Sequence, residues 1–410
     1  MTRSRQRANG EGSIFPYRNG YAAYGWVTTP DGKRRRKWAY GRTRQDVHAK
    51  WLKLHDSARR GPMPTSSPTL AGYMTYWLRE VVVPPDYAPL TCATYETLTR
   101  LYVLPGLGPK RLDKLTLRDV RSWLNKLRDT CQCCAQGKDA RRPEKQRRCC
   151  AKVPATCCRR LASERTIRDA WTILCSALTN AVTEDLIPRN VGSLAHVSKP
   201  RTRKVKPWTA EEARQFLESA KRDQDPLYAA YVLILVLGLR KGEVVGLPWA
   251  AVDLDRGELD VGWQLQRVRR QLLHRETKTE ASEATLPLPG ICVTALRIRE
   301  KDQASAKAAA GASWVDSGLV FTTRAGTPFE PRNLNRRFET RCAKAGVRRI
   351  TVHDMRHTCA TLLAALDVHP RVAMRILRHA QIDVTMNVYT EVSDDKTLKA
   401  LKRLGRQLGS

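Results

Sequence analysis

The chain has 410 residues, of which 42% are hydrophobic and 28% charged, so it is long enough for two or three compact domains. Its 73 Lys and Arg against 40 Asp and Glu give a formal net charge of +33, which is typical of proteins that bind nucleic acid. The longest apolar run, YAAYVLILVLGL, has twelve residues, fewer than the roughly 18 of a membrane span. The composition therefore favours a nucleic-acid partner and no membrane partner.

The first residues, MTRSRQRANGEGS, lack the apolar stretch of a secretory signal. We therefore expect the protein to remain in the reducing cytoplasm. In that compartment its twelve cysteines are not expected to form disulfides.

Residues 1–60 form a basic module with fifteen Lys and Arg against four acidic residues. Turn signals at Arg18-Asn19-Gly20 and Pro30-Asp31-Gly32 separate apolar and aromatic stretches, which predicts a small three-stranded sheet. Thr43 and Asp46 then predict the start of a helix through about residue 58. A basic run interleaved with aromatic residues is typical of a DNA-contacting sheet, although a solvated charge run is the alternative. Its candidate DNA contacts are Lys33, Arg34, Arg35, Arg36 and Lys37.

A Pro/Ser-rich linker at 61–68 leads to a region, residues 69–197, that the sequence predicts to be all-helical. Helical periodicity runs over about 69–80, 91–104, 115–130 and 162–187. Thr116 and Asp119 have the spacing of a capping pair at the start of the third of these helices.

An insertion at residues 131–158 places seven cysteines in 28 residues. Cys131 and Cys134 have CxxC spacing, and two adjacent pairs follow, so thiolates can close a tetrahedral structural zinc site. The alternative is a flexible basic insertion with reduced thiols. The candidate ligands are Cys131, Cys133, Cys134, Cys149, Cys150, Cys157 and Cys158.

A second basic linker, residues 198–207, precedes a third region at 208–398 and a short tail at 399–410. Thr209 and Glu212 predict the first helix of this region, and residues 250–288 are predicted to be rich in strands. The candidate DNA contacts in the linker are Arg201, Arg203, Lys204 and Lys206.

Within the third region, the stretch HDMRHT places His353 and Arg356 three residues apart, so they share one face of a helix. Upstream, the apolar run leads directly into Arg240, where a charge needs an anionic partner. Each residue alone has an ordinary structural explanation: Arg240 can simply pair with Glu243, and His357 can replace His353 in a catalytic role. The full set of candidates, in chain order, is Arg240, Lys278, His353, Arg356, His379 and Tyr389.

This ordered set resembles the active site of the tyrosine recombinases, the phage integrase family. The resemblance rests on Arg240 in GLRKGE, Lys278 in a hairpin-like stretch, the HxxR helix, His379 in LRH and Tyr389 ten residues later. It implies an arm-type DNA-binding domain at 1–60, a helical core-binding (SAM-like) domain at 69–197 and a catalytic domain at 208–398. The expected fold is therefore multidomain α+β, mostly helical in the catalytic domain, with small antiparallel sheets.

Two positions depart from the family pattern. Arg378 stands where the family usually has glycine before the histidine, so we expect the turn before His379 to differ. Glu283 occupies the neighbourhood in which the lysine hairpin often carries an arginine. Lys241 and Arg275 are nearby cations that can be confused with Lys278.

The resemblance also implies a chemistry without a catalytic cofactor. Arg240 and Arg356 would bind the oxygens of a DNA phosphodiester, because guanidinium stays protonated and offers paired N–H groups. Tyr389 would attack phosphorus, His353 would assist its proton transfer, Lys278 would protonate the leaving oxygen and His379 would hydrogen-bond a phosphate oxygen. Glu243 would position Arg240, and Asp354 would orient its neighbours rather than react.

We therefore expect a site-specific integrase of a phage or integrative element. It would act as a homotetramer on double-stranded attachment sites through a Holliday junction, together with an excision or host architectural factor. A type IB topoisomerase, a catalytically silent DNA-binding regulator of the same fold, and a zinc-dependent nucleic-acid-binding protein are the alternatives.

Overall fold

The computed structural model describes residues 14–29, 32–61, 67–199, 206–277 and 283–378. In the first range and the one after it, three antiparallel strands, β1 (Phe15–Tyr17), β2 (Gly20–Thr28) and β3 (Arg34–Gly41), form a sheet in the order β1-β2-β3. The predicted turn at Arg18-Asn19 joins the first two strands, whereas Pro30 and Asp31 lie outside the described residues. The predicted three-stranded sheet is confirmed.

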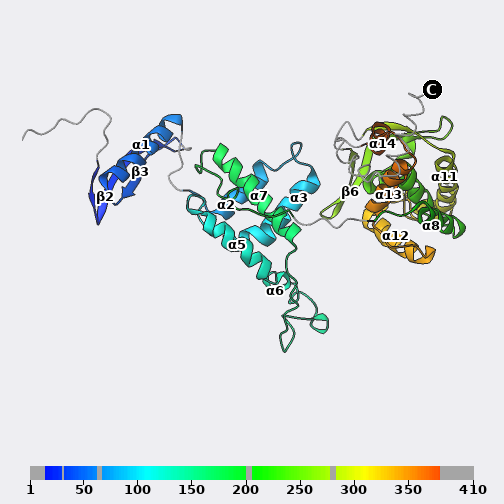
Figure 1. The fold of residues 1–410 in the computed structure, drawn as a ribbon, viewed down its shortest axis with the longest axis horizontal. Helices are drawn as coiled ribbons and strands as arrows, with labels where there is room; N and C mark the ends of the chain where they lie inside the picture. The colour runs from blue at the N-terminus through cyan, green and yellow to red at the C-terminus, as the bar shows by residue number, and fades with distance from the viewer. Residues whose placement is uncertain (1–13, 30–31, 62–66, 200–205, 278–282, 379–410) are drawn as a thin grey trace, which may run out of the picture. The chain divides into compact units, whose positions relative to one another are not determined.

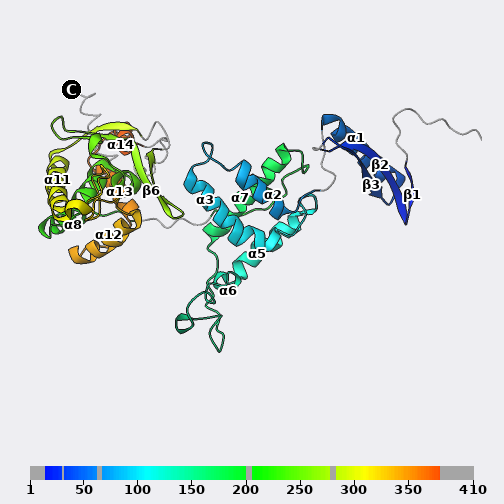
Figure 2. The same ribbon diagram turned by 180° about the vertical axis from the view of Figure 1, so that it is seen from behind.

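Helix α1 (Arg44–Arg60) covers one face of this sheet, as Figures 1 and 2 show. It begins where the sequence predicts, because the Thr43 side chain accepts a hydrogen bond from the backbone N–H of Asp46. Val47 and Trp51 of the helix pack with Ala23 of β2 in a small core. The other face of the sheet therefore lies opposite the helix.

Residues 69–187 are built from helices: α2 (Leu70–Glu80), α3 (Pro89–Leu98), the π-helical turn η1 (Thr99–Val103), α4 (Leu104–Leu107), the short turn η2 (Leu112–Lys114), α5 (Leu117–Asp129) and α7 (Glu164–Thr183). The capping box of Thr116 and Asp119 is present at the start of α5. The helix predicted at 91–104 extends further, to Leu107, through the widened turn that precedes Pro105. A π-helical turn is one way in which a helix accommodates a local irregularity such as a proline.

The insertion between α5 and α7 contains only two short helical turns among the described residues, α6 (Gln132–Ala135) and η3 (Glu144–Gln146). Its buried apolar cluster consists of Cys131, Cys133 and Cys149, with Cys150 packed against them. Val153, an aliphatic residue of this segment, is 93% exposed. The insertion therefore has a cluster of cysteines in place of an aliphatic core.

The last region is a separate compact unit with a large hydrophobic core. Its helices are α8 (Ala210–Arg222), α9 (Tyr228–Leu237), α10 (Lys241–Val245), α11 (Gly290–Ala310), α12 (Pro331–Ala345), α13 (Val352–Ala365) and α14 (Pro370–Leu377), with short turns η4 (Trp249–Ala251) and η6 (Gly311–Ser313). Helix α9 is buried along nearly its whole length, as its continuous apolar sequence predicts. None of the helices in the described ranges is long and apolar enough to cross a membrane.

Two small sheets complete this unit and confirm the predicted β-rich segment. Strands β4 (Val252–Asp253), β5 (Glu258–Val261) and β8 (Ala284–Pro287) form one antiparallel sheet, and β6 (Trp263–Val268) pairs with β7 (Gln271–Glu276) in the other. The β6–β7 hairpin packs on α10: His274 Nε2 lies 2.7 Å from the carbonyl oxygen of Gly246. The start of α10, at Arg240, is thereby fixed between α9 and this hairpin.

Candidate active site

Arg240 is delivered to the surface of the third region by the end of the buried helix α9. Gly238 ends that helix in the left-handed conformation, with φ of 60°, which glycine adopts at little cost. A Cβ at this position would also lie 2.5 Å from Leu377 Cδ2. Leu239 then returns to the core, and Arg240 becomes the N-cap of α10 with its side chain 40% exposed. The GLR sequence therefore sets the direction of this arginine.

Glu243, one turn into α10, is the anion around which the site is organised. Its carboxylate accepts hydrogen bonds from the backbone N–H of Arg240 at 2.7 Å and from Arg240 Nη1 at 2.6 Å. Only 4% of its side chain is exposed. Burial alone would raise the pKa of this carboxyl, but the charge of Arg378 and the hydrogen bonds and charge of Arg240 outweigh burial and hold the pKa below its usual value. Glu243 is therefore ionised and contacts Arg240 as predicted.

Arg378 is the second cation on Glu243, and here the sequence-based expectation was wrong. We expected the turn before His379 to differ because arginine replaces glycine, but Arg378 itself adopts the left-handed conformation, with φ of 52° and ψ of 52°. Its Nη2 donates to Glu243 Oε2 at 2.7 Å, and only 1% of its side chain is exposed. The buried ion pair holds the residue in a conformation that is unfavourable for a side chain with a Cβ.

Arg356, on α13, is buried beneath the same turns. Its Nη1 and Nη2 donate to the carbonyl oxygens of Gly238 and Leu377, which are the ends of α9 and α14. Burial, followed by the charges of Arg240 and Arg378, lowers the pKa of Arg356 to about 9, so it remains a cation at neutral pH. One guanidinium thus ties together two helix ends that carry negative partial charge.

His353 lies one turn before Arg356 on α13, exposed in the same groove. Its ring packs edge-on against His357, with 4.8 Å between ring centroids. Partial desolvation, then the charges of His357 and Arg356, lower the pKa of His353 below its usual value, which favours the neutral imidazole at pH 7. Asp354 has a structural role, as expected, because it closes the capping box of α13 with Thr351.

The groove beside these residues is bordered by many cations. Lys241 lies next to Arg240, and burial together with the nearby charge of Arg332 lowers its pKa. Carboxylates on the groove are paired: Glu330 with Arg267, and Glu339 with Arg349. The basic residues that line it are Lys206, Arg240, Lys241, Arg267, Arg332, Arg348, Arg349 and Arg356.

Three of the six predicted catalytic residues, Arg240, His353 and Arg356, are therefore brought together on one groove. The other three, Lys278, His379 and Tyr389, lie outside the described residues, as do Arg201, Arg203 and Lys204. Lys206 is described and lines the groove.

The predicted basic run in the first module is divided between the two faces of its sheet. Arg36 pairs with Trp26 and Arg34 with Thr28 on the face opposite α1, and Arg36 Cζ lies 4.9 Å from the ring centroids of both Tyr24 and Trp26. Arg35 pairs with Val27 and Lys37 with Gly25, which alternation places on the helix face. Lys33 precedes β3, and its carbonyl oxygen accepts from Thr29. Only part of the run thus belongs to the aromatic face.

The sequence-based reasoning missed the pairing of Arg378 with Glu243. The available signal was an arginine in a glycine position, next to a buried apolar segment that contains one acidic residue, Glu243. A charge at such a place requires a partner of opposite sign. It also missed Arg332 and Arg348 on the groove, for which the sequence contains no distinguishing spacing.

Comparison with known proteins agrees with this geometry. Residues 207–396 match the model of the phage integrase family, and residues 69–128 match the model of the N-terminal SAM-like domain of phage integrases. The chain is 26% identical to a protein named "Tyrosine recombinase XerC-like" from Caldanaerobacter subterraneus, over 91% of this chain and 92% of that protein. It is 27% identical to an integrase of Streptomyces ambofaciens, over 89% of this chain and 88% of that one.

Solved structures share the fold. The Tn1549 transposon integrase in complex with transposon right end DNA aligns with a TM-score of 0.63 at 20% identity, over 82% of this chain and 99% of that one. A lambda integrase tetramer bound to a Holliday junction aligns with a TM-score of 0.55 at 17% identity, over 95% of this chain and 99% of that one. The chain belongs to the phage integrase family, the tyrosine recombinases, which are enzymes that cleave and rejoin DNA strands at specific sites.

Proposed function

We propose that this chain is the integrase of a phage or an integrative element, and that it recombines double-stranded attachment sites through a 3′-phosphotyrosine intermediate. The observation that carries the proposal is the placement of Arg240 and Arg356 beside His353 on one cation-lined groove. The names of the relatives, which include integrases and transposon proteins, support the same assignment.

The charge at this site fits the reaction. Arg240, Arg356 and Arg378 surround one ionised carboxylate, Glu243, so the group retains two positive charges. A phosphodiester carries one negative charge, and the five-coordinate phosphorus formed on attack carries a second. A site with two fixed positive charges therefore stabilises the transition state more than the bound substrate, which is the requirement for catalysis.

The two arginines are suited to hold phosphate without moving. Arg240 uses Nη1 on Glu243 and Nη2 on the carbonyl oxygen of Arg378 at 3.1 Å. Arg356 uses both of its Nη atoms on backbone carbonyls. Since a guanidinium has five N–H groups, each arginine keeps N–H groups for phosphate oxygens. Their orientation is fixed before the DNA binds, so little reorganisation accompanies the reaction.

The remaining roles follow the order of the residues in the chain. Tyr389 is the proposed nucleophile, and neutral His353 accepts or relays its phenolic proton. Lys278, two residues after the end of β7, is the proposed acid for the leaving 5′-oxygen, and His379 the proposed donor to a phosphate oxygen. The retained phosphotyrosine bond allows religation without a nucleotide cofactor.

We further propose that the enzyme works as a homotetramer on paired sites through a Holliday junction. The tetrameric, junction-bound lambda integrase supports this arrangement. The aromatic and arginine-rich face of the first module would contact separate arm-type DNA sequences, and the linker residues Arg201, Arg203, Lys204 and Lys206 would contact the DNA backbone. An excision or host architectural factor would set the direction of recombination.

The experiment uses the DNA that flanks the gene as the source of attachment sites. A core site carrying a nick is incubated with wild-type protein, Arg240→Ala and Arg356→Ala, and cleaved strands are separated on a denaturing gel. We expect each variant to lose about 10²–10³-fold in cleavage rate, as is typical when one transition-state donor is removed. Arg349→Ala is the matched control, because Arg349 lines the groove but pairs with exposed Glu339. Cleavage by both active-site variants at the control rate would refute the proposal.

A further inference from the structure

The seven cysteines of the insertion converge on one place in the fold, although they come from three separate stretches of its sequence. The sulfur of Cys131 lies 3.7 Å from that of Cys158, Cys133 3.5 Å from Cys149, and Cys134 3.8 Å from Cys157. In a tetrahedral zinc–thiolate site with Zn–S bonds of about 2.3 Å, neighbouring sulfurs are about 3.8 Å apart. The spacings therefore match the edges of such a tetrahedron.

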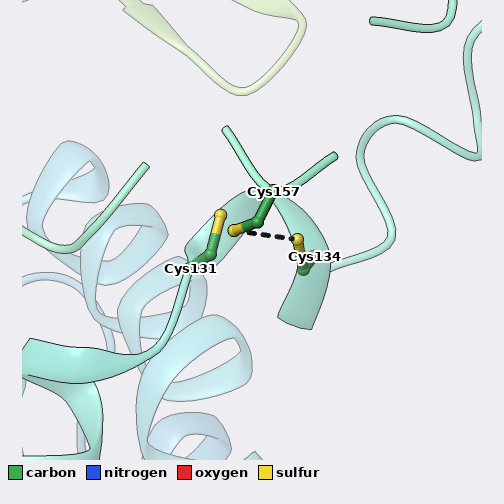
Figure 3. Close-up of side chains that lie close together, drawn as sticks. All are labelled: Cys131, Cys134 and Cys157. Carbon is green, nitrogen blue, oxygen red and sulfur yellow. Dashed lines mark hydrogen bonds between the residues drawn. The ribbon is translucent and has the colours of Figure 1, made fainter. Parts of the chain in front are cut away.

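The sulfurs form two overlapping groups rather than isolated pairs. Cys131, Cys134 and Cys157 have sulfurs within 4.8 Å of one another, and Figure 3 shows the three side chains pointing toward a common point. Cys133, Cys149 and Cys158 form a second group with the same closeness. Cys158 belongs to the second group and also lies beside Cys131 of the first.

From this arrangement we infer that the insertion binds two zinc ions in one thiolate cluster, in which Cys158 bridges both ions. Two tetrahedral ions need eight ligand positions, and seven cysteines fill them when one sulfur is shared. The first ion takes Cys131, Cys134, Cys157 and Cys158. The second takes Cys133, Cys149, Cys158 and Cys150, whose sulfur can join that of Cys149 in a common site. This inference is independent of the proposed function.

The backbone around the sulfurs is arranged as in a built metal site. The N–H groups of Cys133, Cys134 and Arg160 face the Cys131 sulfur, and the N–H of Arg159 donates to Cys157 Sγ at 3.4 Å. Such donors stabilise thiolates and orient them toward a metal. They act on the first and last stretches of the insertion, where the CxxC and the final cysteine pair lie.

Asp139 positions the middle stretch. Its fully buried carboxylate accepts from the backbone N–H groups of Arg148, Cys149 and Ala151 at 2.9–3.0 Å and from Arg142 Nη1 at 2.9 Å. These four donors occupy its oxygens, so Asp139 is a positioning residue that presents the adjacent cysteine pair and not a ligand itself.

Two physical features of the insertion require such a cluster. Its buried apolar residues are all cysteines, so it has no hydrophobic core to offset the entropy of ordering, whereas thiolate-bound zinc supplies on the order of 10 kcal/mol in small domains. Residues 131–160 also contain nine Lys and Arg against two acidic residues. Two zinc ions with seven thiolates carry three negative charges, which this basic surrounding neutralises.

The test measures metal in the full-length chain purified in reducing buffer without chelator. Elemental analysis for zinc and iron, with native mass spectrometry, should give about two zinc ions per chain and no iron. About one zinc, less than a tenth of an equivalent, stoichiometric iron, or disulfides mapped among the seven cysteines would each overturn the inference.

Variants test the shared ligand. Against a colorimetric zinc chelator, Cys157→Ser should release one zinc about tenfold or more faster and retain the other, whereas Cys158→Ser should release both at the faster rate; even changes outside the ligand sphere have effects of this size. Cys175→Ser is the control, since Cys175 lies on α7 outside the cluster, and should behave as wild type. Loss of a single zinc from Cys158→Ser would refute the bridge.

Discussion

The ion pair between Glu243 and Arg378 gives a prediction whose size follows from burial. In Glu243→Gln the shape of the side chain is kept and its charge removed. Arg378, with 1% of its side chain exposed, then loses its anionic partner, and Arg240 and Arg356 lie close to it. Removal of one partner from a buried pair costs about 3–5 kcal/mol. We expect a loss of this size in the free energy of unfolding, measured by urea unfolding of the full chain and followed by tryptophan fluorescence, because Trp208 is buried in this unit.

Glu339→Gln is the matched control. Glu339 also pairs with an arginine, Arg349, but the two side chains are 49% and 70% exposed, and such a pair contributes about 0–1 kcal/mol. Equal losses in the two variants would refute the reasoning. The loss should also depend on pH. Because the pKa of Glu243 is lowered in the folded state, its contribution is present above the unfolded pKa of about 4.5 and declines as pH falls through the folded value. The difference between wild type and Glu243→Gln should therefore shrink on acidification, and a pH-independent difference would contradict it.

Two further predictions concern proton transfer and DNA binding. If neutral His353 takes up the tyrosine proton, His353→Gln should lose about 10²–10⁴-fold in cleavage rate; since its pKa is lowered, wild-type cleavage should be flat from pH 6.5 to 8 and fall at more acidic pH, and His357→Gln should keep that acid limb. On the first module, Arg36→Ala should weaken binding to arm-site DNA and reduce the slope of log K against log salt by about 1, while Arg35→Ala, on the helix face, should change neither; equal effects in a salt titration of binding would count against the open face as the contact surface.

Local signals in the sequence were sufficient for many elements. Thr116, Thr209 and Thr351 each cap a helix through the side chain three residues later, a contact that depends on nearest neighbours alone. The strands of the first module were also predictable, because turn residues and aromatic residues alternate at short range. The convergence of Arg240 with Arg356 followed from the resemblance, not from spacing.

Contacts between distant residues were not predictable in the same way. Arg378 adopts the left-handed conformation because Glu243, 135 residues away in the chain, compensates its charge. The sequence around Arg378 alone predicts an altered turn, and this was wrong. The cysteine spacing likewise indicated a zinc site, but the sharing of Cys158 between two groups depends on how the three stretches fold together.

The central claim is that Tyr389 attacks the scissile phosphate. A phenol is a weak nucleophile at neutral pH, with a reference pKa near 10, and needs the cations and the base assigned above. Tyr389→Phe removes the attacking oxygen and should keep DNA affinity, because the net charge of +33 is unchanged. The decisive measurement traps the covalent protein–DNA complex on a nicked suicide substrate and maps the modified peptide by mass spectrometry. The account predicts a 3′-phosphate joined to Tyr389 and no covalent complex with Tyr389→Phe at equal DNA binding; a normal yield from that variant, or a modified residue elsewhere, would contradict it.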